Sequence, residues 1–451
     1  LALATLTLIV GCQKDPMGEE GENTEPPIAK TLDEELTLLL QNASDGSGKA
    51  YFQLPAPTSL SDIPQDPNNT LTAKKVELGK LLFHETGFGT IPKNFESLAT
   101  YSCASCHHAA AGFQAGVRQG VGEGGLGFGI RGEARLADPD YGFDFLDIQP
   151  IRSPTIINSA WQKVMLWNGQ FGATDVNTGT ESRWALRSPK QVNFLGFEGL
   201  ESQAIAALKV HRMDVNPDNV EALGYKDFFD QAFNEIPVGE RYTDTIAGLA
   251  MAAYERTTLS NEAPFQQWLA GKGDAMTEAE KKGAILFFGE AGCVRCHTGP
   301  ALNSTAFYAL GMNDLDGEGV TYVPAQASFT SAEGRGGFTG KDEDYYKFKV
   351  PQLYNLKDSP FYGHGANFTS VKSVIEYKNA AQPQNTNVPA SQIHDGFQPL
   401  NLSNEEIDQL TIFIENSLYD PNLDRYAPDQ LPSGNCFPNS DAQSRIDLNC
   451  E

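Results

Sequence analysis

The pentapeptide Cys103-Ala-Ser-Cys106-His107 returns later in the chain as Cys293-Val-Arg-Cys296-His297. Cys-x-x-Cys-His is the attachment signature of c-type haem, in which two thiols form thioethers with the porphyrin and the adjacent histidine binds the iron. The two copies therefore predict two covalently bound haems, with His107 and His297 as the iron ligands.

Two other interpretations use the same cysteines. A four-thiolate zinc site has its two Cys-x-x-Cys pairs about 15–20 residues apart, whereas Cys106 and Cys293 are separated by nearly half of the chain. A pair of disulfides or thioredoxin-like motifs makes no use of the two histidines. Both alternatives leave His107 and His297 unexplained, so haem attachment is favoured.

The composition describes a chain that can fold and that carries a strong negative charge. It has 451 residues, of which 40% are hydrophobic, enough for a core and for more than one domain. Lys and Arg number 33 against 58 Asp and Glu, for a net charge of -25. This balance argues against nucleic acid as a partner, because phosphates need a basic surface. It fits an exported protein that meets a basic or neutral partner.

The beginning of the sequence resembles a bacterial export signal. Eleven largely apolar residues run into Cys12 through Ile9-Val10-Gly11, which resembles a lipobox, and a polar, acidic stretch follows to residue 29. Residues 1–29 are therefore predicted to be a lipoprotein signal and tether, with a membrane anchor on Cys12 and a periplasmic or outer-membrane location. The alternative is a simple signal peptide, cleaved nearby. No other stretch is long enough to span a membrane.

Two cysteines remain in a polar tail at residues 426–451. In an oxidising compartment Cys436 and Cys450 are expected to form a disulfide, with free thiols as the alternative.

An internal repeat surrounds the two haem motifs. Gly79-Lys-Leu-Leu-Phe83 precedes the first and Gly283-Ala-Ile-Leu-Phe287 precedes the second, and Thr277 lies three residues before Glu280 as in a capping box. Each copy is interpreted as a helix that leads into a haem loop. The fold class is therefore mainly α, with two cytochrome c-like domains.

The predicted domains are an N-terminal extension at 30–74, a first haem domain at 75–240 and a second at 241–425. Further helical stretches are expected at Glu198–Val210 and Tyr242–Arg256. Between Gly120 and Gly132 glycine is too frequent for any regular element, and Asp314–Asp344 is a similar, less dense loop.

Over residues 75 to 380 the chain resembles the bacterial di-haem cytochrome c peroxidases and the related di-haem enzymes of methylamine utilisation. The resemblance rests on the haem motifs and on five further segments: Leu78–Phe83, Pro154–Asn158 with Leu166–Gly169, Leu200–Ala204, Tyr254–Thr257 with Ser260 and Pro264-Phe265, and Phe348–Leu353 with Pro360–His364.

The resemblance implies a division of labour. Peroxide would be cleaved at the haem on His107, and electrons from a small redox protein, a c-type cytochrome or a cupredoxin, would enter at the haem on His297. Trp167 falls where the family places a tryptophan between the haems, so it is the candidate for electron relay, with a core aromatic as the alternative.

The first site departs from the family pattern. Glu123 stands where many members have a distal histidine ligand, which predicts an open iron that needs no reductive activation. Gln203 is retained, but the family's catalytic glutamate is replaced in the stretch that holds His211 and Arg212. His211 is a natural proton-transfer group, and Arg212 is expected to polarise the O–O bond. A surface or structural role is the alternative for His211.

The second site lacks an obvious methionine ligand. The family's ligand position falls on Lys378, with Tyr377 beside it and Met312 as another candidate. His364 is expected to contact a haem propionate. An inter-haem calcium, which the family implies, is put in doubt by Arg152, which falls where an asparagine ligand is expected.

The leading hypothesis is a di-haem peroxidase that reduces hydrogen peroxide. The alternatives are a high-valent di-haem oxidase acting on a protein or organic substrate, and a non-enzymatic di-haem electron carrier. Whether the chain forms a homodimer is left open.

Overall fold

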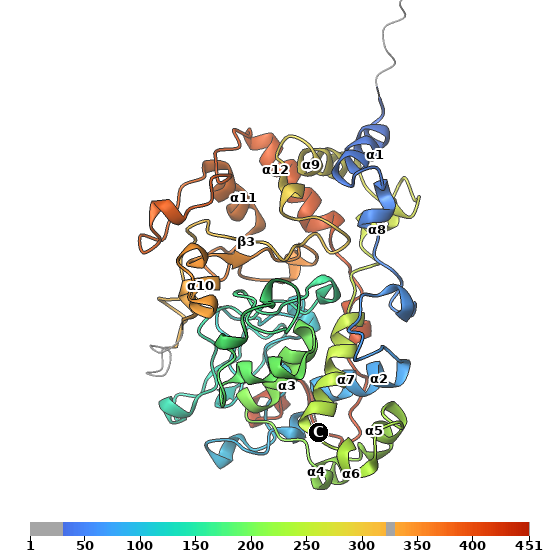
Figure 1. Ribbon diagram of the computed structural model, residues 1–451, viewed down its shortest axis with the longest axis vertical. Coiled ribbons are helices and arrows are strands. Elements are labelled where there is room, and N and C mark those ends of the chain that lie inside the picture. Colours follow the sequence, from blue (N-terminus) through green and yellow to red (C-terminus); the bar gives the residue numbers. More distant parts are fainter. Residues whose placement is uncertain (1–29, 322–329, 451) are drawn as a thin grey trace, which may run out of the picture.

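The computed structural model describes residues 30–321 and 330–450, and the fold is mainly helical, as predicted (Figure 1). The signal, Cys12 and tether lie outside the described residues. The helices are α1 (Leu32–Ala43), α2 (Ala73–His84), α3 (Gly199–Val210), α4 (Pro217–Ala222), α5 (Lys226–Ala232), α6 (Val238–Arg241), α7 (Asp244–Thr257), α8 (Pro264–Leu269), α9 (Glu278–Phe288), α10 (Gly334–Thr339), α11 (Val371–Ala380), α12 (Asn404–Ile412) and α13 (Ala442–Asp447). Within the described ranges, none of them is long and apolar enough to cross a membrane.

The two expected entry helices are α2 and α9, and the repeated glycine in each has a packing reason. A Cβ on Gly79 would lie 1.9 Å from the carbonyl oxygen of Ala250 in α7, and one on Gly283 would lie 2.0 Å from that of Gln409 in α12. Only glycine permits such close backbone approach. The predicted capping box between Thr277 and Glu280 is also present at the start of α9.

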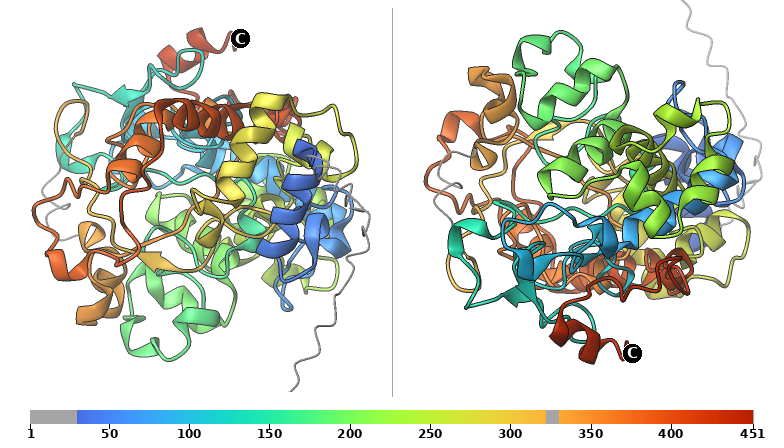
Figure 2. Two further views of the ribbon diagram at one scale, coloured as in Figure 1. Left: turned by 90° about the horizontal axis from the view of Figure 1, so that it is seen from above. Right: turned by 90° about the horizontal axis from the view of Figure 1, so that it is seen from below.

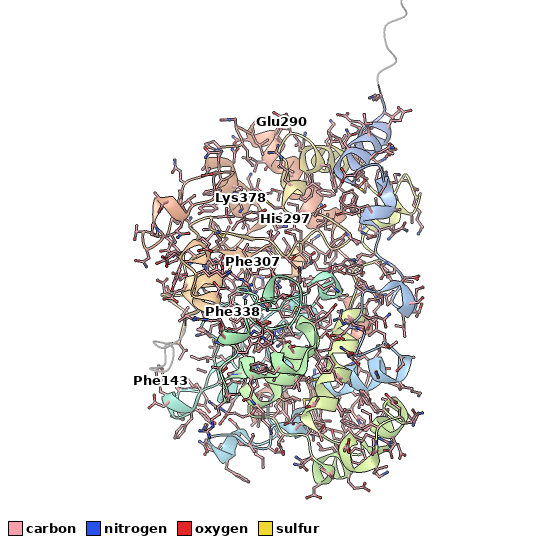
Figure 3. All side chains as sticks on the ribbon, viewed as in Figure 1. Phe143, Glu290, His297, Phe307, Phe338 and Lys378 are labelled. Carbon is pink, nitrogen blue, oxygen red and sulfur yellow. A yellow bond between two sulfur atoms is a disulfide. The ribbon has the colours of Figure 1, made fainter. Side chains whose placement is uncertain are left out.

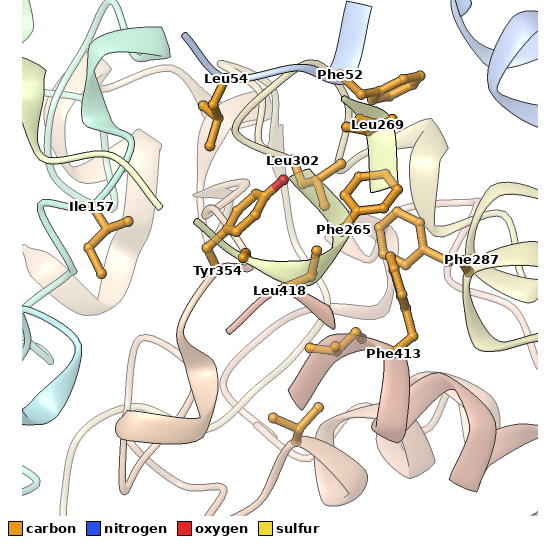
Figure 4. Packing of buried hydrophobic residues seen from close by; sticks show 14 of the residues in the cluster. Phe52, Leu54, Ile157, Phe265, Leu269, Phe287, Leu302, Tyr354, Phe413 and Leu418 are labelled. Carbon is orange, nitrogen blue, oxygen red and sulfur yellow. The ribbon is translucent and has the colours of Figure 1, made fainter. Parts of the chain in front are cut away.

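Two hydrophobic cores support the two haem loops. One combines apolar residues of α2, α3 and α7. The other combines α1, α9 and α12, which lie side by side in Figure 2, and Phe265, Phe287 and Phe413 pack together within it (Figure 4). The predicted domain boundary at 240/241 stays a prediction. Helix α7, just beyond that boundary, packs against α2 and α3.

The N-terminal and C-terminal segments each pack against a part of the chain that is distant in sequence. Helix α1, in the N-terminal extension, packs against α9 of the second haem domain. The C-terminal end of the chain lies at the opposite end of the molecule, close to the first domain (Figure 1). Each terminal segment therefore lies against the predicted haem domain that is more distant in sequence.

The expectation that residues 120–132 hold no regular element is wrong in one detail. Strand β1 (Gly125–Leu126) pairs with β2 (Leu136–Ala137), and a second two-stranded ribbon joins β3 (Phe307–Tyr308) to β4 (Phe348–Lys349). Gly127 and Gly129 follow β1 with positive φ, so glycine here allows the chain to turn back and pair.

Helix α7 buries a carboxyl group whose titration should affect stability. Burial raises the pKa of Glu255 to about 8, and one of its oxygens has no hydrogen-bond partner among the described residues. Because the folded state binds this proton more tightly than the unfolded state, the free energy of unfolding should fall as pH rises from about 4.5 towards 8, by at most about 1.4 kcal/mol per pH unit. Urea titrations of wild type and Glu255→Gln across this range test this, and equal slopes would contradict it.

Candidate functional site

The four motif cysteines are free thiols in the structure. Burial raises the pKa of Cys103, Cys106 and Cys293 to about 12. Within the described ranges no cluster of three or more His, Cys, Asp or Glu side chains could hold a metal ion. The disulfide and zinc interpretations therefore find no support, and the thiols remain available for thioether formation.

Both motif histidines are oriented as iron ligands would be. Nδ1 of His107 lies 3.3 Å from the carbonyl oxygen of Phe113, and Nδ1 of His297 lies 3.0 Å from that of Pro351. Burial lowers both pKa values to about 4, so the rings are neutral. A ring that donates Nδ1–H to a carbonyl keeps Nε2 free of its proton and ready to bind metal. The residues at both motifs thus fit a covalently attached haem.

A cavity of about 500 Å³ opens beside the second motif, and Cys293, Cys296 and His297 line it. Lys378 and Met312 line it too, and burial lowers the pKa of Lys378 to about 8. Figure 3 labels His297 and Lys378 in this region. The structure thus brings two of the three predicted ligand candidates to the haem motif.

The third ligand candidate, Tyr377, does not line this cavity. Its hydroxyl donates to the carbonyl oxygen of Leu310 at 2.5 Å, and its ring packs between Phe368 and Phe397. Consecutive side chains on a helix point about 100° apart, so α11 directs Lys378 and Tyr377 to different surroundings.

Trp167 and His364 line the same cavity as the second motif. The Trp167 ring meets His364 edge-on at 6.3 Å, and its Nε1 donates to the carbonyl oxygen of Arg152 at 2.9 Å. His364 stacks on Phe348 and lies 3.2 Å from Asp314.

Glu123 and Arg212, predicted separately from two segments, form an ion pair. Glu123 is fully buried, and its carboxylate also accepts hydrogen bonds from the Tyr141 hydroxyl and the backbone N–H groups of Lys93 and Asn94. The loop that carries it lies against the first motif, since a Cβ on Gly120 would lie 2.7 Å from Sγ of Cys106. The charged pair is therefore next to the first haem attachment site.

His211 belongs to the same region through an aspartate that sequence reasoning missed. Its Nδ1 lies 2.7 Å from Oδ2 of Asp147, whose backbone pairs with that of the Glu123 loop. Burial alone would lower the pKa of His211, but the charge of Asp147 and the hydrogen bond to it outweigh burial and raise it. Neither Asp147 nor Tyr141 belongs to a sequence motif, so no local signal could have found them.

Gln203 lies on α3 and is partly buried. Its side chain makes no hydrogen bond to the Glu123 group in the described part of the chain. The structure thus brings together three of the four predicted residues of the first site.

Arg152 lies where the calcium ligand was expected. Its guanidinium donates to the carbonyl oxygens of Val117 and Ala115 and to the Ser359 hydroxyl. A fixed cation thus occupies a group of oxygens that could otherwise attract a metal ion.

The C-terminal tail holds the first motif in place, and its predicted Cys436–Cys450 disulfide is confirmed. The carbonyl oxygen of Pro438 accepts hydrogen bonds from the hydroxyls of Ser102 and Ser105, on either side of Cys103. Asp441 forms a buried ion pair at 2.8 Å with Arg135, which donates to the carbonyls of residues 121 and 122. The tail therefore supports both the haem loop and the loop of Glu123.

Loss of this disulfide should destabilise the protein. The bond joins residues 14 apart, and closing a loop of that length stabilises by about 3 kcal/mol. We expect Cys436→Ser with Cys450→Ser to lower the thermal midpoint, and a reductant to lower it in wild type but not in the double variant. Equal midpoints for the two proteins without reductant would contradict this.

Comparison with known proteins gives a consistent picture. Residues 73–274 match the family model described as di-haem cytochrome c peroxidase. The methylamine utilization protein MauG of Methylorubrum extorquens is 26% identical, covering 83% of this chain and 85% of that one. The cytochrome-c peroxidase IdrP1 of Denitromonas iodatirespirans is 27% identical, covering 83% and 88%.

Solved structures support the fold. A MauG-like protein associated with microbial copper homeostasis aligns with a TM-score of 0.53 at 22% identity, over 83% of this chain and 95% of that one. The diheme peroxidase BthA of Burkholderia thailandensis aligns with a TM-score of 0.50 at 13% identity, over 85% and 92%.

Proposed function

We infer that this member of the di-haem cytochrome c peroxidase family reduces hydrogen peroxide to water with electrons from a small redox protein. The reaction consumes one peroxide, two electrons and two protons and yields two waters. The observation that carries the proposal is the buried Glu123–Arg212 pair, with His211 and Asp147 nearby, beside the first haem motif. An electron carrier has no need of such a group of proton-transfer side chains.

Bound haem would supply the iron at which the O–O bond is cleaved. The Arg212 guanidinium would orient the peroxide and stabilise negative charge on the departing oxygen. His211, whose pKa is raised by Asp147, would donate a proton to that oxygen, and Glu123 would accept one from the other. Electrons would enter at the second motif and reach the first past Trp167.

For the second haem we propose Lys378 or Met312 as the further axial ligand, because both line its cavity and Tyr377 does not. A second candidate function is oxidation of a protein or organic substrate. Relatives named for methylamine utilisation favour it.

The test is a stopped-flow spectrum of the haem-loaded, fully oxidised protein mixed with hydrogen peroxide. A rapid Soret shift supports an open first site and an enzyme. A reaction that needs one reduced haem supports a peroxidase with a hidden ligand and contradicts the open site. If the protein reacts with peroxide neither when fully oxidised nor when one haem is reduced, the peroxidase proposal is contradicted and the electron-carrier hypothesis remains.

The pairing of His211 with Asp147 predicts a change in pH dependence. In Asp147→Asn the carboxylate charge is lost, burial dominates, and the pKa of His211 falls. If protonated His211 is the acid, the rate should drop at a lower pH than in wild type, and each unit of pKa lost cuts the protonated fraction about tenfold above the pKa. The pH profile of the peroxide reaction measures this. Asp144→Asn, an exposed residue three positions away, is the control, and an unshifted Asp147→Asn profile would exclude the pairing from catalysis.

A further inference from the structure

The cavity beside the second haem motif is basic although the chain is strongly acidic. Its lining includes four basic side chains, Arg152, Arg295, Lys349 and Lys378. The one carboxylate in the described lining, that of Asp314, is already held by His364 at 3.2 Å and Asn385 at 2.8 Å. Of the four, Arg152 and Lys349 are buried, and a buried positive charge without an acidic neighbour needs a counter-charge from elsewhere.

Arg152 is the clearest case. Its side chain is 1% exposed, and every hydrogen bond that it makes goes to a neutral oxygen, of Ala115, Val117 or Ser359. Its Nε has no partner in the described part of the chain. Burial without a nearby acid lowers the pKa of Arg152 to about 10. A buried guanidinium is costly unless it is paired with an anion.

Lys349 repeats the pattern on the strand that faces the same cavity. Its Nζ donates to the side-chain oxygen of Gln162 and, at 2.6 Å, to the carbonyl oxygen of Val164. The side chain is 6% exposed and no described carboxylate lies against it. Burial lowers its pKa to about 7. Two buried cations of the same cavity thus lack an anionic partner from the protein.

We propose that Arg152 and Lys349 form a carboxylate-binding site inside this cavity, and that its ligands are the propionate groups of the haem attached at Cys293 and Cys296. This proposal rests on the proposed function only in one respect: both require that a haem is attached at the second motif. Its consequence is electrostatic: fixed positive charge beside the haem disfavours the oxidised form and raises the reduction potential. Arg152 and Lys349 are therefore positioning residues that make this haem a better electron acceptor.

The experiment is a spectroelectrochemical titration of the haem-loaded protein. The wave of the second haem is identified by its loss in a Cys293→Ala, Cys296→Ala variant. Arg152→Gln should lower the midpoint potential of that wave and make it pH-dependent near neutrality, because the carboxylates then protonate more readily. Arg152→Lys, which keeps the charge, should restore most of the potential. Lys357→Gln makes the same charge change at an exposed position and should leave the wave in place.

If Arg152→Gln does not accumulate, Lys349→Met provides the second variant, with the same expected direction. If the midpoint potential of the second haem and its pH dependence are unchanged in both variants, the propionate site is contradicted. Arg152 would then have only the structural role of joining loops through its hydrogen bonds. The outcome is separable from the peroxidase proposal. If the variants shift the wave but the wild-type protein does not react with peroxide, the propionate site is supported and the peroxidase proposal is contradicted. If the wild-type protein reacts with peroxide but the variants leave the wave unshifted, the peroxidase proposal is supported and the propionate site is contradicted.

Discussion

Replacing Glu123 with glutamine is expected to slow the reaction with hydrogen peroxide by about 10²–10³-fold, because the first site loses its proton acceptor and the partner that orients Arg212. The native carboxylate accepts hydrogen bonds from the Tyr141 hydroxyl and from the N–H groups of Lys93 and Asn94. The amide group of glutamine is itself a donor, so it cannot replace the carboxylate as the acceptor of all these bonds. Stopped-flow spectra at several peroxide concentrations give the rate constant.

This substitution should also destabilise the fold, by about 3 kcal/mol, because Arg212 would be left without its buried partner. Rates are therefore compared well below the melting temperature. Glu133→Gln is the matched control: Glu133 is exposed on the same glycine-rich segment and accepts only from local backbone N–H groups. Tyr141→Phe, which removes one hydrogen bond from Glu123, should have a smaller effect on the rate. A Glu123→Gln protein that reacts at the wild-type rate would restrict Glu123 to a structural role.

Replacing Arg256 with methionine should cost about 3–5 kcal/mol of stability, the largest such effect that we expect. Arg256 is fully buried in α7 and donates to both carboxylate oxygens of Glu201, at 2.9 and 2.7 Å, and to Glu198 at 3.1 Å. It also donates to the carbonyl oxygen of Pro64. Methionine would leave the buried carboxylate of Glu201 without a charged partner, whereas Glu198 would keep its ion pair with Lys163.

Chemical unfolding of the purified protein measures this cost, with Lys282→Met on the exposed face of α9 as the control for the loss of a positive charge. A double variant separates the energy of the Arg256–Glu201 ion pair from the cost of leaving one charge buried without a partner. Arg256→Met combined with Glu201→Leu should be less destabilised than the sum of the single variants, because no charge is left buried alone. A single-variant cost below about 1 kcal/mol would show that water reaches the site.

Local sequence was sufficient for features whose chemistry lies within a few residues. The two Cys-x-x-Cys-His motifs gave the attachment sites, and the capping box at Thr277 and Glu280 gave the start of α9. The disulfide of Cys436 and Cys450 followed from the predicted export signal and from an even remainder of cysteines. The repeated glycines of α2 and α9 were visible as a pattern, but their reason, contact with the backbones of α7 and α12, was not.

By itself, the sequence predicted two haem-attachment motifs and the cysteines and histidines that would hold the haems, and it located the helices that lead into each motif. Only the tertiary structure decided which distant residues meet there: Arg212 with Glu123, 89 positions apart, Asp147 with His211, and the tail against Ser102 and Ser105. It also decided that α11 directs Lys378, and not Tyr377, to the cavity. Covalent attachment of haem needs a fixed spacing of cysteine and histidine along the chain, so a short stretch of sequence is enough to predict it. Ion pairs and cavities depend on how helices pack across the whole molecule, which no short window of sequence specifies.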